Sequence, residues 1–350
     1  MSTATAALKA AQVFQQLDEE GLGFIDVGAR GGIHHPAFQE AGGLLRVVGF
    51  EADPQACKQL NDLHRPKHPF KSLRYLPYAL GDADGQRFLH QCRSGGNSSF
   101  HRPNRSFLDR FPNPGRFDVT ETITVPVRAL DQLLKAEAPS FPPHLDFIKI
   151  DTQGSELEVL QGARGLLREQ ILGVEIEVEF NRQYESQPLF RDVDAWLSEC
   201  GFTLFKLRRL EWVRQNFERQ AHLTAGQLVF GDALYLKDPL MHPQPETILR
   251  TPRRAQALML IATLYDLHDF ALEIASHPVT AALFDARATQ RYILARSRRL
   301  APPLGRIHGF LRGLKAYRES HGDLKQLLPW LHRYDRSCAR PDLDFYTRLK

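Results

Sequence analysis

The fold class follows most directly from Phe24–Gly32, FIDVGARGG. A short apolar run that ends directly in glycines is typical of a buried strand that leads into a tight loop. The next such run, Val47–Glu51, ends in a carboxylate 23 residues after Gly28. Ligands of open parallel sheets bind at the carboxyl ends of the strands, where such an acid accepts hydrogen bonds from ribose hydroxyls. The two features together predict a site for a nucleoside-bearing cofactor.

Further apolar runs alternate with helical segments along residues 24–236. Strands are expected at 24–27, 47–51, 73–80, 147–151, 174–180, 202–207 and 227–236, and helices at 54–63, 156–168 and 192–200. This alternation predicts an α/β fold with a mostly parallel sheet covered by helices on both faces. No clear crossover helix separates the last two strands, which could therefore form an antiparallel edge pair.

Composition indicates an ordinary soluble protein. The chain has 350 residues, of which 43% are hydrophobic and 25% charged, so about two domains are expected. No window approaches the roughly 18 uninterrupted apolar residues of a membrane span, and the first twenty residues lack the pattern of a secretory signal. The four cysteines are widely scattered, which argues against a disulfide framework or a cysteine metal cluster. We expect a cytoplasmic protein.

The distribution of charge predicts the domain boundary. Residues 241–350 carry 18 basic and 10 acidic side chains, although the net charge of the chain is only +4. A proline-rich segment without periodicity, 237–245, lies where the sign changes and is typical of a linker. We therefore expect an N-terminal helix at 1–20, a cofactor domain at 21–238 and a basic helical domain at 239–350.

The glycine loop favours a cofactor without a phosphate. Gly28 is not followed by the second glycine of the dinucleotide fingerprint G-x-G-x-x-G, and the chain has no phosphate-binding P-loop motif. S-adenosylmethionine carries a carboxylate, an ammonium, a ribose and a sulfonium cation, and Asp26, Glu51 and Asp151 suit its positive groups. A nicotinamide-dependent oxidoreductase stays open as a weaker alternative.

At this point the sequence resembles a known family, the FkbM-type S-adenosylmethionine-dependent methyltransferases. The resemblance covers about residues 20–238. The stretches that carry it are Asp26–Gly32, Phe50–Pro54, Ala79–Asp82, Val125–Asp131, Phe147–Glu156, Glu177–Phe180 and Gly201–Phe202. The resemblance implies a seven-stranded class I (Rossmann-like) methyltransferase sheet, followed here by a helical domain outside the family pattern. It also implies O-methylation of a sugar hydroxyl in a glycan or glycolipid precursor.

The resemblance also implies the residues that hold the cofactor. They are Asp26, Gly28 and Gly32 for the methionine part, Glu51 and Asp53 for the ribose, and Asp82 for the adenine amino group. Each of them ends a predicted strand or begins the following loop, so the family and the strand pattern agree. Asp82 also fits an ordinary turn sequence.

Four residues are candidates for catalysis. A hydroxyl acceptor must lose a proton, so a general base helps, and Asp151 ends the fourth predicted strand. Lys149 lies two residues earlier on the same face. Glu177 is the middle member of the alternating acids 175, 177 and 179, which would be costly on a buried strand unless paired or functional. His34 follows the glycine loop and is a natural base. Asp151 and Glu177 could also hold a divalent cation, although no spacing establishes a metal site.

A long segment rich in Pro, Asn and Arg, Cys92–Arg116, is predicted to cover the acceptor. The substrate-binding candidates in it are Asn97, Ser98, Ser99 and Arg102, with Arg105 as a further contact for an anionic acceptor. An ordinary surface loop is the competing interpretation.

The basic C-terminal region predicts several amphipathic helices. Its charge suits a solvated surface, a peripheral membrane contact or a homo-oligomer contact through residues 250–350, whereas no motif for nucleic acid accompanies it. A non-catalytic scaffold that binds the cofactor and acts through this region is the alternative from another functional class.

Overall fold

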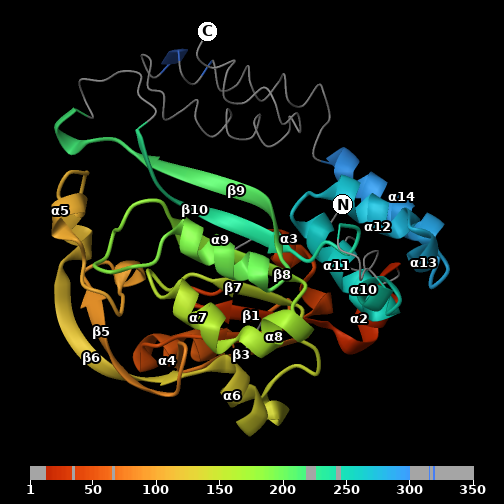
Figure 1. Ribbon diagram of the computed structural model, residues 1–350, viewed down its shortest axis with the longest axis horizontal. Coiled ribbons are helices and arrows are strands. Elements are labelled where there is room, and N and C mark those ends of the chain that lie inside the picture. Colours follow the sequence, from red (N-terminus) through yellow and green to blue (C-terminus); the bar gives the residue numbers. More distant parts are fainter. Residues whose placement is uncertain are drawn as a thin grey trace. The chain divides into compact units, whose positions relative to one another are not determined.

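The main sheet of the computed structural model has seven strands (Figure 1). Their order is β3 (Ser72–Leu76), β2 (Leu45–Phe50), β1 (Leu22–Val27), β7 (Phe147–Ile150), β8 (Gly173–Glu179), β10 (Gln227–Leu236) and β9 (Thr203–Trp212). The structure describes residues 13–33, 36–64, 68–217, 226–241 and 246–299, together with 315, 318 and 319. The predicted strands are present, although the one expected at 73–80 is divided into two. The strand order reverses between β1 and β7, which places a switch point at their carboxyl ends.

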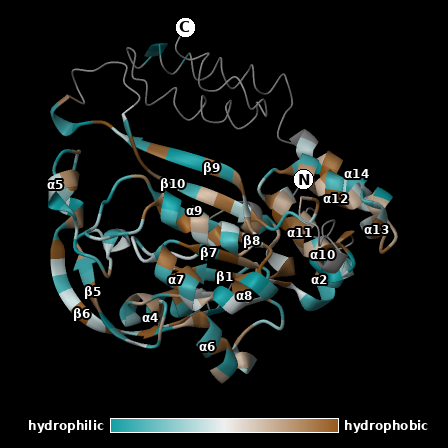
Figure 2. Ribbon diagram, viewed as in Figure 1, coloured by the Kyte–Doolittle hydropathy of each residue, from teal (hydrophilic) through white to brown (hydrophobic). Residues whose placement is uncertain are grey.

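The last two strands form the antiparallel edge pair that the sequence allowed. β10 is antiparallel to both β8 and β9, whereas the other neighbouring strands of this sheet are parallel. β9 lies at the edge and is largely hydrophilic (Figure 2), as expected for a strand with one unpaired side.

One face of the sheet packs against four helices to form an extended core cluster. The helices are α6 (Leu130–Ala136), α7 (Glu156–Gly162), α8 (Arg164–Glu169) and α9 (Phe190–Glu199). The sequence predicted one helix over 156–168, but the helix is interrupted after Gly162. A Cβ atom at Gly162 would lie 1.9 Å from the carbonyl oxygen of Gly81, so this close approach of two backbones requires glycine.

The opposite face is covered by α3 (Pro36–Glu40), α4 (Pro54–His64) and the start of the helical region. The rings of Phe24, Phe38, Phe147 and Tyr265 pack with centroid separations of 4.9 to 5.7 Å. Helices on both faces confirm the predicted fold class.

A second sheet was not predicted. It contains β4 (Ala79–Leu80), β6 (Val119–Arg128) and β5 (Gly85–Cys92), and the last two form a long antiparallel pair (Figure 1). The expected single strand over 73–80 is divided between the two sheets, with Pro77 at the break, since proline cannot donate a ladder hydrogen bond. Within the predicted cover segment, α5 (Arg105–Leu108) buries Phe107 and Leu108.

The helices after the sheet are α10 (Glu246–Leu249), α11 (Pro252–Leu264), α12 (His268–Ser276), α13 (Pro278–Ala281) and α14 (Ala286–Arg299). The prediction of amphipathic helices is wrong for α11, which is buried on all sides. In the basic region expected to form helices, residues 286–299 form α14, whereas residues 300–350, apart from 315, 318 and 319, lie outside the described residues. Of the helices that the structure describes, none has the length and apolar composition needed to cross a membrane.

The chain divides into two compact units, residues 1–286 and 287–350. The first unit contains the sheet together with α10 to α13. The boundary expected at 238/239 stays a prediction. At the other end, α2 (Gln15–Glu20) covers the last part of the helix expected at 1–20, and residues 1–12 lie outside the described ranges.

Candidate active site

A cavity of about 200 Å³ opens at the switch point of the main sheet. Its lining comes from three parts of the chain: the ends of β1 and β2, the loop after β7, and the small sheet with the segment that follows β5. The lining residues include Gly28, Arg30, Glu51, Leu80, Leu89, Gly95, Gly96, Ser98, Phe100, Asp151 and Gln153. Gly28, Glu51, Ser98 and Asp151 were candidates from the sequence, whereas the contribution of the small sheet was missed.

The glycine loop allows the ends of β1 and β7 to approach each other. Gly28 has φ +77°, and a Cβ atom there would lie 1.9 Å from the carbonyl oxygen of Asp151. Gly31 and Gly32 also have positive φ, which glycine adopts at little cost. Gly28 lines the cavity, whereas Gly32 does not.

Glu51 presents a buried carboxylate to the cavity. The residue is 6% exposed, and its Oε1 accepts a hydrogen bond from the backbone N–H of Asp53 at 2.9 Å. Burial raises the pKa of Glu51, with the backbone hydrogen bond and Arg30 opposing the shift. A carboxylate in this position is suited to accept hydrogen bonds from the hydroxyls of a ribose.

Asp53 begins helix α4. Its Oδ1 accepts the backbone N–H groups of Gln55 at 2.9 Å and Ala56 at 3.3 Å, which is the arrangement of a helix N-cap. Sequence reasoning missed this role, although an aspartate directly before Pro54 is a typical signal for it. The assignment of Asp53 to the ribose stays a prediction beside this structural role.

The two remaining cofactor candidates lie outside the cavity lining. Asp82 is exposed in the turn between β4 and β5, and the cavity wall near it is apolar, formed by Ala79, Leu80 and Leu89. Asp26 is 2% exposed on β1, and its Oδ1 lies 3.9 Å from Nζ of Lys149. Their roles toward the cofactor stay predictions.

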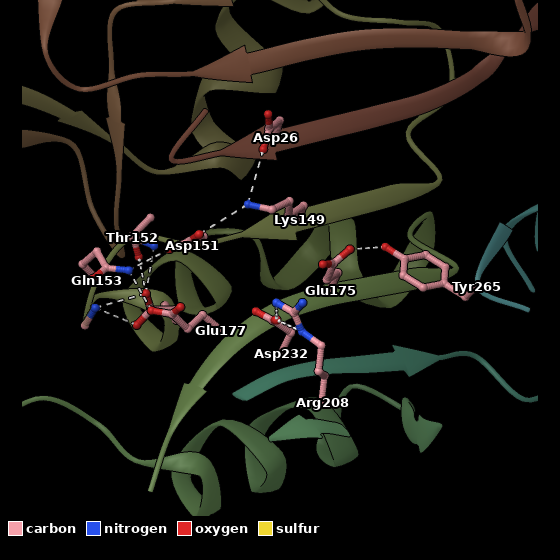
Figure 3. Close-up of polar contacts among 12 residues, drawn as sticks. Asp26, Lys149, Asp151, Thr152, Gln153, Glu175, Glu177, Arg208, Asp232 and Tyr265 are labelled. Atoms are coloured by element: carbon pink, nitrogen blue, oxygen red, sulfur yellow. Dashed lines mark hydrogen bonds and ion pairs between the residues drawn. The ribbon is translucent and has the colours of Figure 1, made fainter. Parts of the chain in front are cut away.

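Three of the four catalytic candidates lie in one polar network (Figure 3). Nζ of Lys149 lies 3.6 Å from Oδ2 of Asp151. The side-chain amide of Gln153 donates to Oδ1 of Asp151 at 2.9 Å and to Oε1 of Glu177 at 2.7 Å. The fourth candidate, His34, lies outside the described residues, as does its neighbour His35.

The ionisable groups of this network differ in how readily they carry a charge. Burial raises the pKa of Glu177 well above its ordinary value, and the neighbouring carboxylates of Asp151 and Glu179 raise it further. Burial alone would lower the pKa of Lys149, but Asp26 and Asp151 outweigh it, so the net shift is upward. Lys149 therefore keeps its positive charge, and Glu177 holds its proton to higher pH than an ordinary glutamate does.

Glu156 fixes the loop that carries Asp151. Its carboxylate accepts the backbone N–H groups of Thr152 and Gly154, both at 2.9 Å, and the hydroxyl of Thr152 at 3.1 Å. Glu156 is 3% exposed. In the sequence, Glu156 was recognisable only as a member of the family motif. The backbone N–H groups that its carboxylate accepts cannot be identified from the sequence.

Of the predicted substrate residues, only Ser98 is part of the cavity lining. Ser99 is buried and donates to the carbonyl oxygen of Gln153 at 2.6 Å. The carbonyl oxygen of Asn97 accepts the hydroxyl of Tyr184 at 2.9 Å. Arg102 is exposed. Arg105 forms ion pairs with Asp109 and Asp118, so it stabilises its own segment.

The sequence was also compared with models of known protein families. Residues 26–204 match the methyltransferase FkbM domain, which is half of the chain. The chain belongs to the FkbM methyltransferase domain family. The matched residues include the glycine loop, Glu51, Asp151 and Glu177, whereas α10 to α14 lie beyond them.

Solved structures match the chain at low identity and with low TM-scores. An FkbM methyltransferase from Methylobacillus flagellatus KT is 16% identical with a TM-score of 0.36, and the match covers 62% of this chain and 44% of that one. The FkbM chain described here thus spans less than half the length of that protein. Magnesium protoporphyrin IX methyltransferase from Synechocystis PCC 6803 is 10% identical with a TM-score of 0.33, covering 67% and 79%. The comparison with curated proteins found no match.

S-adenosylmethionine, the cofactor of the FkbM family, fits the chemistry of the cavity. Glu51 offers a buried carboxylate that would suit a ribose, and Ala79, Leu80 and Leu89 offer an apolar wall that would suit an adenine. Beside Gly96 the space that a Cβ atom would take is open. The described part of the chain holds no cluster of three His, Cys, Asp or Glu side chains arranged to bind a metal ion.

Proposed function

We propose that this protein is an S-adenosylmethionine-dependent O-methyltransferase that acts on a sugar hydroxyl of a glycan or glycolipid precursor. The observation that carries the proposal is one cavity lined by a buried ribose acceptor, Glu51, and by a partly exposed carboxylate, Asp151. The sugar acceptor rests on the family resemblance.

Asp151 is the proposed general base. Its side chain is 38% exposed, so an acceptor hydroxyl can reach it, and its carboxylate takes the proton as the oxygen is methylated. The bound cofactor supplies an electrophilic methyl group on a sulfonium. Nζ of Lys149 lies 3.6 Å from Oδ2 of Asp151, and the cavity walls hold the reacting groups close together.

A cytoplasmic location is part of the proposal. Cys57, Cys92 and Cys200 are buried free thiols, which is usual where thiols stay reduced. Peripheral membrane or homo-oligomer contacts through residues 250–350 also belong to the proposal.

Calorimetric titration tests the cofactor. We expect S-adenosylmethionine and S-adenosylhomocysteine to bind the wild-type protein and NAD not to bind. Glu51→Ala should weaken both interactions at least a hundredfold, because two hydrogen bonds to a charged acceptor are lost, at about 1.5–3 kcal/mol each. Asp62→Ala, an exposed acid on α4, is the matched control and should bind as the wild type does. No binding of either adenosyl compound would overturn the proposal.

A second stage separates an enzyme from a scaffold. Sugars and glycolipid precursors are screened for release of S-adenosylhomocysteine. Asp151→Asn should keep cofactor affinity within a fewfold and lose turnover by about 10²–10⁴-fold, the usual contribution of a general base. Unchanged turnover in Asp151→Asn would exclude this residue as the base.

A further inference from the structure

Gln153 has an unusual backbone conformation at the wall of the cavity. Its φ is +58°, in the left-handed region that residues with a side chain seldom adopt. Such a conformation persists only where the surrounding structure holds it, and it is most often found at functional sites. The contacts of Gln153 show what holds it.

The side chain of Gln153 uses all of its hydrogen-bonding groups. The amide nitrogen donates to Asp151 on one side and to Glu177 on the other, at 2.9 and 2.7 Å. The amide oxygen lies 3.1 Å from the hydroxyl of Tyr184, whose one proton it shares with the carbonyl oxygen of Asn97. A glutamine amide offers two donors and one acceptor group at any ordinary pH, so these three contacts match its chemistry.

Gln153 is connected to the segment after β5 in two ways, through its own backbone and through Tyr184. Ser99 donates to the carbonyl oxygen of Gln153 at 2.6 Å, and the hydroxyl of Tyr184 also lies 2.9 Å from the carbonyl oxygen of Asn97. Gly95, Gly96, Ser98 and Phe100 of this segment line the cavity. Gln153 is therefore the point where the cavity wall and the two acids meet.

The contact with Asp151 fixes the carboxylate of the proposed base. Its Oδ1 is held by Gln153, and its Oδ2 faces Lys149 at 3.6 Å. Two anchors on different oxygens set the plane of a carboxylate. Glutamate at position 153 would have the same shape without the two donors, and alanine would have neither shape nor donors.

We propose that Gln153 is a positioning residue that couples the cavity wall at residues 95–100 to the orientation of the Asp151 carboxylate. The part that concerns Asp151 rests on the proposed function, whereas the coupling to the cavity wall does not. Cofactor affinity should then depend on the amide of Gln153, although Asp151 and Glu51 are unchanged.

The test is binding of S-adenosylhomocysteine at pH 6 and pH 8 to the full chain carrying Gln153→Glu or Gln153→Ala. At pH 8, Gln153→Glu places a third carboxylate between Asp151 and Glu177, and we expect at least a tenfold loss of affinity. At pH 6 part of this carboxylate is protonated and donates one hydrogen bond, so at least threefold of the loss should be recovered. Gln153→Ala should lose affinity at both pH values without recovery.

The other titratable groups around position 153 are the same in the wild type, Gln153→Glu and Gln153→Ala. They are Asp151, Glu177 and Tyr184, which contact Gln153, with Lys149, Glu156, Glu179 and His101 close by. The difference between Gln153→Glu and Gln153→Ala therefore reports the donor at position 153. Equal losses for the two variants at both pH values, or no loss for either, would overturn the proposal.

Two variants and one further measurement keep the test decisive if Gln153→Glu fails to fold. Tyr184→Phe and Ser99→Ala each remove one anchor and should weaken S-adenosylhomocysteine binding at least threefold, equally at both pH values. Hydrogen exchange of residues 95–100 in the ligand-free protein should be at least tenfold faster in Gln153→Ala. An unchanged exchange rate would overturn the proposed coupling. The exchange measurement needs no bound cofactor, so it can be made even if the wild-type protein binds none. Failure of the wild-type protein to bind cofactor would count against the proposed function and not against the coupling.

Discussion

Glu179 lies at the end of β8 with 2% of its surface exposed, and its Oε1 has no hydrogen-bond partner among the described residues. Burial raises the pKa of Glu179 well above 4.5, and the carboxylates of Glu156 and Asp151 raise it further. The folded protein therefore keeps this proton at pH values where the unfolded chain has lost it. Stability consequently falls as the pH rises from about 4.5 through the folded pKa, by up to about 1.4 kcal/mol per pH unit.

Glu179→Gln should remove this dependence. The variant should have a higher free energy of unfolding than the wild type at pH 8 and a similar one at pH 4, where the glutamate is largely protonated in the unfolded chain as well as in the folded one. Urea unfolding at the two pH values measures the difference. Glu199→Gln, an exposed acid on α9, is the control and should change little. A destabilised Glu179→Gln at pH 8 would show that the hydrogen bond with Gln187, which lowers the pKa of Glu179, outweighs the effect of burial.

At the scale of elements, α11 is joined to the sheet by a buried ion pair. Arg253 is 6% exposed, and its guanidinium donates to both oxygens of Asp146, just before β7, at 2.8 and 2.7 Å. It also donates to the carbonyl oxygen of Gly21 at 2.6 Å. Asp146 in turn accepts the N–H of Gly23 at 2.9 Å, so β1, β7 and α11 share one cluster.

Arg253→Met should lower the free energy of unfolding by about 3–5 kcal/mol, because it leaves the Asp146 charge buried without its partner. Adding Asp146→Asn should restore part of that loss. The control is Arg254→Met on the same helix, where the wild-type side chain donates a hydrogen bond to the carbonyl oxygen of Glu169 at 3.2 Å, and it should cost less than about 1 kcal/mol. Equal effects of the two arginine variants in urea denaturation would argue against the ion pair as the cause.

At the scale of the whole molecule, the cavity is built entirely from residues 27–155, whereas the first compact unit extends to Ala286. Helices α10 to α13, which lie beyond the family match, are therefore part of the same unit as the sheet. α11 buries Leu258, Leu260 and Ile261 completely, and each such side chain contributes about 1.5–3 kcal/mol.

Two truncations should separate the possible boundaries. A chain that ends at residue 286 should fold and bind S-adenosylhomocysteine within threefold of the full-length protein. A chain that ends at residue 238, the boundary predicted from charge, should not fold, because its sheet loses α11. Circular dichroism and calorimetry check both expectations. A folded, cofactor-binding 1–238 chain would support the charge-based boundary.

The sequence alone determined the succession of the main strands and helices along the chain and the residues at the strand ends. Periodicity and glycine are local signals, so they suffice to place Gly28, Glu51 and Asp151 on the same edge of a parallel sheet. Pro54 likewise predicted the start of α4. The family motif then connected these positions to one cofactor.

Only the tertiary structure decided the small sheet, the burial of α11 and the contacts of Gln153. β6 has a mostly exposed run at its start, so its sequence lacks the apolar period of a core strand, and its partner β5 lies 27 residues away across a long segment. Gln153 takes its conformation from Ser99, Glu177 and Tyr184, which are distant in sequence. Hydrogen bonds between distant residues leave no periodic signal, because their geometry exists only after the strands have paired and packed.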